Sequence, residues 1–194
     1  PNTEAIAQLA AADVIFYNGL MLEGKMADVL QRQTRKNPHV YAVTEQLRQR
    51  SDYVMTDEED YFDPHVWMDV RGWIHAVMFV ADVLSEYDPD HAEPYHANAE
   101  RYIQKLEHLD QYAEQVIGSI PESQRVLVTA HDAFGYMGRA YGIEVEGIQG
   151  LSTDSEAGLK RVNELAKMLA ERDIRAVFIE SSVSPKAVRS LIEG

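Results

Sequence analysis

Two of the seven histidines, His65 and His131, stand where an imidazole could bind a ligand together with nearby carboxylates. In residues 63–69 (DPHVWMD) the proline favours an extended backbone before the following helix, and an aspartate lies two positions before the histidine. In residues 129–134 (TAHDAF) the histidine comes just past a predicted buried strand and before a helix. Imidazoles and carboxylates are strong metal ligands, so both segments are candidates for a metal site.

A metal-binding imidazole needs an acceptor for its second ring nitrogen. Asp63, Asp69 and Asp132 are close enough in sequence to supply one, as is a backbone carbonyl. Glu180 ends a predicted strand, where it could line the same cleft, orient a ligand or take part in a turn network. On spacing alone, capping a helix or a buried polar role is the commoner explanation for both histidines.

Composition narrows the classes of ligand. The chain of 194 residues has no cysteine, which leaves histidine and carboxylates as the strong metal ligands and excludes disulfides. Its formal net charge of −14 repels phosphate backbones and anionic lipids, so a cation is a better partner than nucleic acid or a membrane surface. No apolar run approaches the ~18 residues of a membrane span.

Helix and strand patterns alternate along the chain, which predicts an α/β fold with mainly parallel sheets. The alternation continues on both sides of a central helical region, up to a helix start at Ser184-Pro185. The Asn18-Gly19 pair marks the turn after the first strand. The predicted helices cover residues 3–12, 22–33, 70–87, 95–120, 133–141 and 154–171; the predicted strands cover 13–17, 40–43, 125–129, 143–148 and 176–179, and residues 44–64 are expected to form an irregular loop.

The longest predicted helix, residues 95–120, has no glycine or proline before Gly118. At a rise of 1.5 Å per residue, about 25 residues extend to roughly 40 Å, which is enough to bridge two lobes. We therefore expect an N-terminal α/β lobe at residues 1–94, the interlobe helix at 95–120 and a C-terminal α/β lobe at 121–194.

Four segments, read together, resemble the hallmarks of the manganese/zinc solute-binding proteins of ABC metal importers (cluster A-I). In order along the chain they are residues 12–20 (ADVIFYNGL), 63–69 (DPHVWMD), 129–136 (TAHDAFGY) and 179–182 (IESS). The resemblance implies two lobes joined by one long α-helix, with the metal buried between the lobes.

In the family that this chain resembles, four protein ligands hold the ion, two from each lobe. His65 matches the second ligand and His131 the third. The first is a histidine in an Asp-Pro-His segment before the ADV strand, and the fourth is an aspartate in a strand beyond the last helix seen here. Neither occurs in this sequence, so both lobes are expected to be incomplete, with these ligands in segments outside it.

The resemblance leaves the metal open between Mn(II) and Zn(II), with Fe(II) as a further cargo. His131 stands where manganese-specific relatives often place glutamate, and an added nitrogen favours zinc or mixed specificity. The loop at residues 44–64 is acidic but lacks the histidines of dedicated zinc receptors, which favours the manganese or mixed branch.

The resemblance thus implies a monomeric extracytoplasmic receptor, periplasmic or lipid-anchored to the outer face of the bacterial cell membrane, that delivers metal to an ABC importer permease. It implies no catalytic residue and no enzyme activity. Two alternatives remain: a metal-binding adhesin or interaction protein, and a metal-dependent hydrolase. The hydrolase would need an open coordination position and a general base, and no HExxH pair occurs in the chain.

Overall fold

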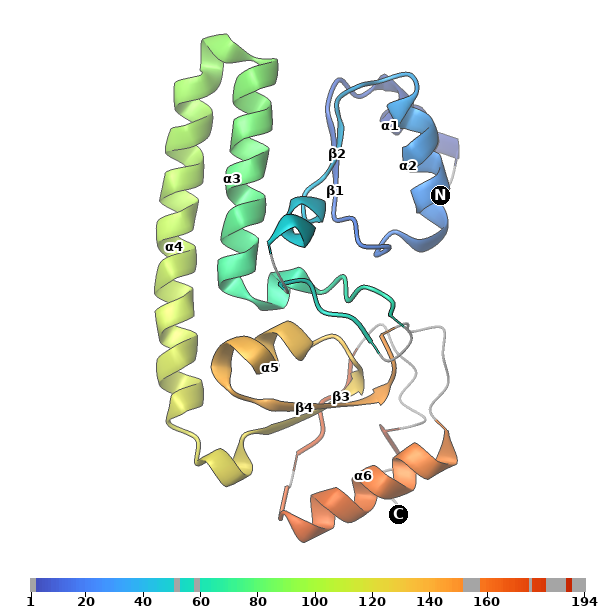
Figure 1. Cartoon of the computed structure of the whole chain (residues 1–194), viewed down its shortest axis with the longest axis vertical. Coiled ribbons are helices and arrows are strands. Elements are labelled where there is room, and N and C mark those ends of the chain that lie inside the picture. Colours follow the sequence, from blue (N-terminus) through green and yellow to red (C-terminus); the bar gives the residue numbers. More distant parts are fainter. Residues whose placement is uncertain are drawn as a thin grey trace. The chain divides into compact units, whose positions relative to one another are not determined.

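The computed structural model describes residues 3–50, 53–57, 60–151, 158–174, 176–180 and 188–189. Contacts divide the chain into two compact units, one of residues 1–66 and 71–106 and the other of residues 67–70 and 107–194. Each unit combines helices with a pair of parallel strands (Figure 1), which confirms the predicted α/β class.

The first unit is built on two short parallel strands. Helix α1 (Thr3–Ala11) leads into β1 (Ile15–Tyr17), which pairs with β2 (Val40–Ala42) so that Ile15 lies opposite Val40. Parallel neighbours need a crossover connection, and the residues between β1 and β2 provide it. The carboxyl ends of both strands therefore lie at the same edge of the sheet.

The crossover helix begins later than the sequence predicts. Instead of one helix over residues 22–33, a 3₁₀ turn at Gly24–Met26 precedes α2, which covers Ala27–Thr34. The backbone is left-handed at Gly19, Leu20 and Met21, with φ of 92°, 53° and 68°, and again at Gly24, inside the predicted helix, with φ of 50°. A right-handed α-helix cannot continue through such a residue. The loop expected at 44–64 was also only partly irregular, because residues 45–49 form a 3₁₀ helix.

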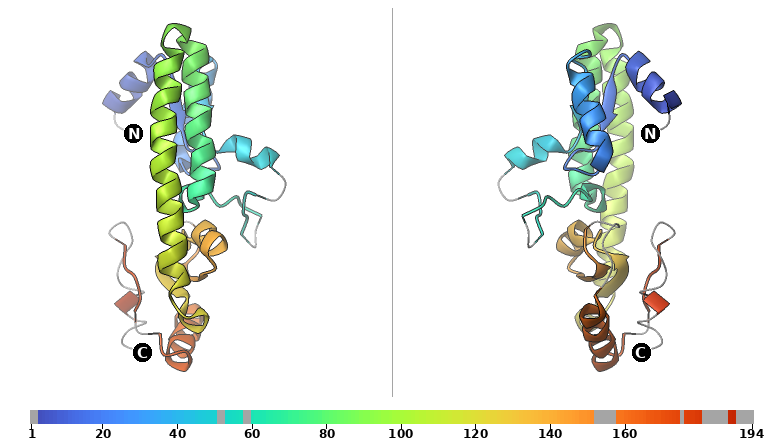
Figure 2. Two further views of the ribbon diagram at one scale, coloured as in Figure 1. Left: turned by 90° about the vertical axis from the view of Figure 1, so that its left-hand side faces the viewer. Right: turned by 90° about the vertical axis from the view of Figure 1, so that its right-hand side faces the viewer.

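Two long helices follow in the chain. Helix α3 (Val70–Tyr87) and the start of α4 (Ala92–Gly118) run antiparallel and side by side (Figures 1 and 2). The long helix predicted from residue 95 begins at Ala92. Pro94 lies in its first turn, where a backbone N–H makes no hydrogen bond within the helix, so a proline is tolerated there. Helix α4 contributes to both units, since the division between them falls after Leu106.

The second unit repeats the strand, helix, strand order. Strand β3 (Val126–His131) and strand β4 (Glu144–Gln149) pair in parallel, with α5 (Gly135–Tyr141) between them in sequence. Gly142, with φ of 68°, ends α5 in the left-handed conformation that commonly terminates helices. His131 is the last residue of β3 and lies opposite Gln149, the last residue of β4.

Two predicted boundaries and one predicted strand in this unit were wrong. The strand expected to end at residue 129 continues to His131, because the N–H of Asp132 still donates to the Gln149 carbonyl (3.1 Å). The helix expected from residue 133 begins only at Gly135. In place of a strand at 176–179, the described residues show a single parallel bridge between Thr129 and Phe178.

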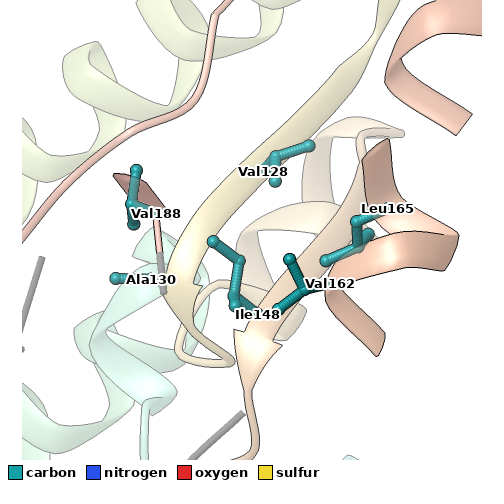
Figure 3. Close-up of a cluster of buried hydrophobic side chains, with 6 residues drawn as sticks. All are labelled: Val128, Ala130, Ile148, Val162, Leu165 and Val188. Atoms are coloured by element: carbon teal, nitrogen blue, oxygen red, sulfur yellow. The ribbon is translucent and has the colours of Figure 1, made fainter. Parts of the chain in front are cut away.

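Helix α6 (Leu159–Glu171) covers the β3–β4 pair and completes a small apolar core. The residues before Gly158 that were expected to begin this helix lie outside the described residues, as do Ser184 and Pro185. The core is shown in Figure 3, and its members come from β3, β4, α6 and the C-terminal segment: Val128, Ala130, Ile148, Val162, Leu165 and Val188. Its packing holds β3 in place up to the residue before His131.

Within the described part of the chain, no helix has both the length and the apolar character needed to cross a membrane.

Candidate metal centre

His65 lies in the first unit and contacts the carboxylate of Asp63. The Oδ1 atom of Asp63 lies 2.7 Å from the ring Nδ1 of His65 and also accepts the backbone N–H of His65 at 2.9 Å. His65 and Asp63 are both buried, with 5% and 3% of their surfaces exposed. Because one oxygen binds both groups, the ring orientation is tied directly to the local backbone.

The segment before His65 is fixed by main-chain pairing. The N–H of Asp63 donates to the Met55 carbonyl at 2.8 Å, and Thr56 forms an antiparallel bridge with Phe62. Pro64 disfavours a helical conformation for Asp63, so the aspartate stays extended and its side chain can reach forward to His65. The aspartate two positions before the imidazole is therefore its partner, as the sequence suggested.

His131, in the second unit, has a carboxylate partner that is distant in sequence. Glu180 Oε2 lies 2.5 Å from His131 Nδ1. Glu180 Oε1 accepts the backbone N–H of His131 at 3.1 Å. The two side chains are 10% and 19% exposed, so water has little access to the pair.

Strand pairing brings Glu180 to His131. The N–H of Phe178 donates to the Val128 carbonyl at 2.8 Å, and Phe178 pairs in parallel with Thr129. Two residues further along both segments, this register places Glu180 beside His131. The carbonyl of His131 is also fixed, because the Thr129 hydroxyl donates to it at 2.8 Å.

The two units thus contain the same arrangement, in which a carboxylate contacts both the backbone N–H and the Nδ1 atom of one buried histidine. A carboxylate at Nδ1 favours the tautomer that carries its proton there. In that tautomer the lone pair that can bind a metal ion is on Nε2. Imidazole rings with fixed orientations can act as nitrogen ligands.

The other two candidate carboxylates have different contacts. Asp69 is buried and its carboxylate lies 3.9 Å from the guanidinium of Arg139. The N–H of Asp132 donates to the carbonyls at the end of β4, so its backbone closes the turn after His131. Among the described residues, no three or more His, Asp or Glu side chains are grouped as a metal site would group them.

Gly147 lies within the strand predicted at residues 143–148, and in β4 it shapes the turn after His131. A Cβ atom at this position would lie 2.8 Å from each of three atoms: Cβ and backbone N of Asp132, and the carbonyl oxygen of Gln149. Its φ is outside the left-handed range, so glycine is required for space alone. Nothing in the neighbouring sequence predicts this close approach of the two backbone segments.

Comparisons with known proteins identify the family of this chain. The pattern of the periplasmic component A of zinc-uptake complexes (ZnuA) matches residues 1–194. The chain belongs to this family. Membership confirms the resemblance to the solute-binding proteins of metal importers. The roles of the individual residues stay a prediction.

Relatives within the family are similar over nearly the whole chain. The manganese-binding lipoprotein MntA of Bacillus subtilis is 46% identical over 187 residues, which are 96% of this chain and 60% of that protein. The solved structure of the periplasmic zinc-binding protein TroA from Treponema pallidum has a TM-score of 0.92 and 42% identity, covering 99% of this chain and 68% of that one. Fe(III)-bound YtgA from Chlamydia trachomatis has a TM-score of 0.90 and 27% identity, covering 99% and 71%. The chain thus spans about 60% of the length of its curated relative.

Removing either carboxylate should weaken metal binding without removing a ligand. We expect Asp63→Asn and Glu180→Gln each to lower affinity for Mn(II) or Zn(II) by ~10–100-fold, as is usual for groups that orient a metal-binding histidine. Isothermal titration with purified full-length protein would measure the change.

The matched control is Asp88→Asn. Asp88 Oδ2 lies 2.8 Å from Nδ1 of His91, so it makes the same kind of contact on an exposed surface. This variant should bind metal as the wild type does. Equal affinity in Asp63→Asn, Glu180→Gln and Asp88→Asn would show that the buried carboxylates do not support a metal site.

Proposed function

We propose that this protein is an extracytoplasmic receptor that captures a divalent transition-metal ion and delivers it to an ABC importer permease. The observation that carries the proposal is the pair of buried histidines, His65 and His131, each oriented by a carboxylate. Membership of the ZnuA family supports it. Proteins named for binding manganese, zinc and iron are among its relatives.

In this proposal the Nε2 atoms of His65 and His131 are metal ligands. The carboxylates of Asp63 and Glu180 hold the proton on Nδ1 of each ring, which makes Nε2 a better electron-pair donor to the metal. Their negative charges also favour a cation at the site, as does the net charge of −14 on the chain. The lobes are residues 1–94 and 121–194, joined by residues 95–120.

We propose Mn(II), or Mn(II) together with Zn(II), as the cargo, with Fe(II) also accepted. Two imidazole nitrogens alone do not separate these ions, and zinc binds most nitrogen and oxygen sites more tightly than manganese does. The physiological metal therefore depends on supply as well as on affinity. Binding takes place in the periplasm or on the outer face of the membrane, where a lipid anchor would hold the receptor, which acts as a monomer.

The proposed receptor has no catalytic residue, because its role is to enclose the ion rather than to expose it to a substrate. A metal-dependent hydrolase would instead hydrolyse generic esters or phosphate esters once loaded with metal. A metal-binding adhesin would show the same affinity for metal, but deleting its gene would leave metal uptake by the cell unchanged. Uptake of radioactive Mn(II) or Zn(II) by deletion and complemented strains separates these functions.

Metal binding itself should be visible as thermal stabilisation. A ligand that binds only the folded state adds RT ln(1 + [L]/Kd), or about 2.7 kcal/mol at a concentration of 100 Kd. We expect the melting temperature of chelator-stripped full-length protein to rise with Mn(II) and with Zn(II) but not with Mg(II), which prefers oxygen ligands. Stripped protein that melts at the same temperature with and without all of these ions would contradict the proposal.

A further inference from the structure

Asn18, which follows β1, forms a direct link to the segment that carries His65. Its Nδ2 atom donates to the carbonyl of Pro64 at 3.1 Å, across 46 positions in the sequence, and to the carbonyl of Gly19 at 3.0 Å. The carbonyl of Pro64 belongs to the peptide bond that leads into His65. Because both neighbours are carbonyl oxygens, this end of the carboxamide must be the NH₂ group.

The backbone of Asn18 is held on both sides. The hydroxyl and the N–H of Thr44 both donate to the Asn18 carbonyl, at 2.7 and 3.1 Å. The N–H of Asn18 donates to the carboxylate of Glu23 at 2.7 Å. Thr44 is fully buried. With its main chain fixed in this way, Asn18 presents its side chain to Pro64 in one direction.

Carboxylates also hold the left-handed turn after Asn18. Glu23 accepts the N–H of Gly19, and Glu45 Oε1 accepts the N–H of Leu20 at 3.1 Å. Leu20, with φ of 53°, is buried and anchors the turn. Burial, followed by the charges of Glu45 and Glu23, raises the pKa of the Tyr17 hydroxyl. A non-glycine residue keeps a left-handed conformation when its surroundings impose it, and here two carboxylates and a buried side chain do so.

We infer that Asn18 is a positioning residue for metal binding by His65. Asp63 fixes the ring of His65 and its backbone N–H, while Asn18 fixes the carbonyl of the preceding residue. Together they hold the peptide unit before the ligand from two sides. The inference rests on the proposed function, since positioning matters only if His65 binds metal.

The Oδ1 atom of Asn18 separates positioning from direct coordination. This oxygen is buried and has no hydrogen-bond donor among the described residues. If Oδ1 bound the ion or its water, Asn18→Asp would strengthen binding, because a carboxylate is the better ligand for a divalent cation. If Nδ2 is the functional group, both Asn18→Asp and Asn18→Ala remove the donor to Pro64 and weaken binding.

Asn37 provides a matched control at the opposite end of β1. Its Nδ2 atom donates to the carbonyls of Ala12 and Asp13, at 3.0 and 3.1 Å, and its Oδ1 accepts the N–H of His39 at 2.8 Å. Like Asn18, it donates from Nδ2 to two carbonyls and so links two segments that are distant in sequence. Asn37→Ala should therefore reduce stability in a similar way while leaving the His65 segment intact.

The test measures Mn(II) and Zn(II) affinity by titration in full-length wild type, Asn18→Ala, Asn18→Asp and Asn37→Ala, at a temperature where all four are folded. We expect about 10-fold weaker binding in both Asn18 variants, at the low end of the range for orienting groups, and wild-type affinity in Asn37→Ala. NMR of the ring nitrogens of His65 in the metal-free protein should show a shifted Nδ1 signal in the Asn18 variants only.

Four outcomes would overturn the inference. Wild-type affinity in both Asn18 variants would show that the link to Pro64 does not matter. Tighter binding in Asn18→Asp would assign the role to Oδ1 instead. Equal losses in the Asn18 and Asn37 variants would indicate general destabilisation. If the wild type itself binds neither ion, the proposed function fails and the inference falls with it.

Discussion

Replacing either histidine should remove most of the metal response of this protein. In His65→Ala and His131→Ala we expect affinity for Mn(II) and Zn(II) to fall by more than ~100-fold, beyond the loss typical of an orienting group. At a metal concentration that stabilises the wild type by about 2.7 kcal/mol, such a variant would gain less than ~0.5 kcal/mol. Thermal unfolding with and without metal measures both values.

Because both histidines are buried, alanine also leaves a carboxylate without its partner, and this alone costs stability. His65→Gln and His131→Gln, which keep more of the side-chain volume, guard against loss of the fold. His96→Ala and His108→Ala on the exposed surface of α4 are the controls and should bind metal normally. If the His65 and His131 variants keep affinity within ~3-fold of the wild type, neither residue is a ligand.

Gly147→Ala should destabilise the second unit and displace the end of β3 that carries His131. The added Cβ would come within 2.8 Å of the backbone N of Asp132 and the carbonyl oxygen of Gln149, and backbone atoms cannot rotate away as a side chain can. Inserting one carbon into such a site typically costs ~1–3 kcal/mol of unfolding free energy. Urea denaturation of the metal-free protein measures this cost. Since Asp132 follows His131 directly, metal affinity should fall as well.

Gly158→Ala is the matched control. No atom lies within 4 Å of a Cβ at Gly158, which precedes α6 with φ of −69° and ψ of 144°, angles that alanine readily adopts. The cost there should be only a few tenths of a kcal/mol. Equal stability of the Gly147 and Gly158 variants would mean that the turn after His131 can shift to accommodate a Cβ atom and does not depend on glycine.

Local patterns in the sequence predicted most of the secondary structure. The long helix was found because no glycine or proline interrupts its interior, and α4 covers 27 residues. Boundaries failed where tertiary contacts decide them. Helix α2 starts late because Gly24, inside the predicted helix, is left-handed with φ of 50°. Strand β3 extends to His131 because β4 continues to pair beside it.

The two histidines differ in how much of their environment is local. The sequence alone determined that Asp63 could reach His65, because two residues of extended chain beside a proline allow few conformations. It also determined the α/β class, the absence of thiolate ligands and the negative charge. Only the tertiary structure decided that Glu180, 49 positions from His131, is its partner, and that Asn18 contacts Pro64. Backbone geometry fixes neighbours in sequence, whereas distant residues meet through strand register and close packing, which no short stretch of residues encodes.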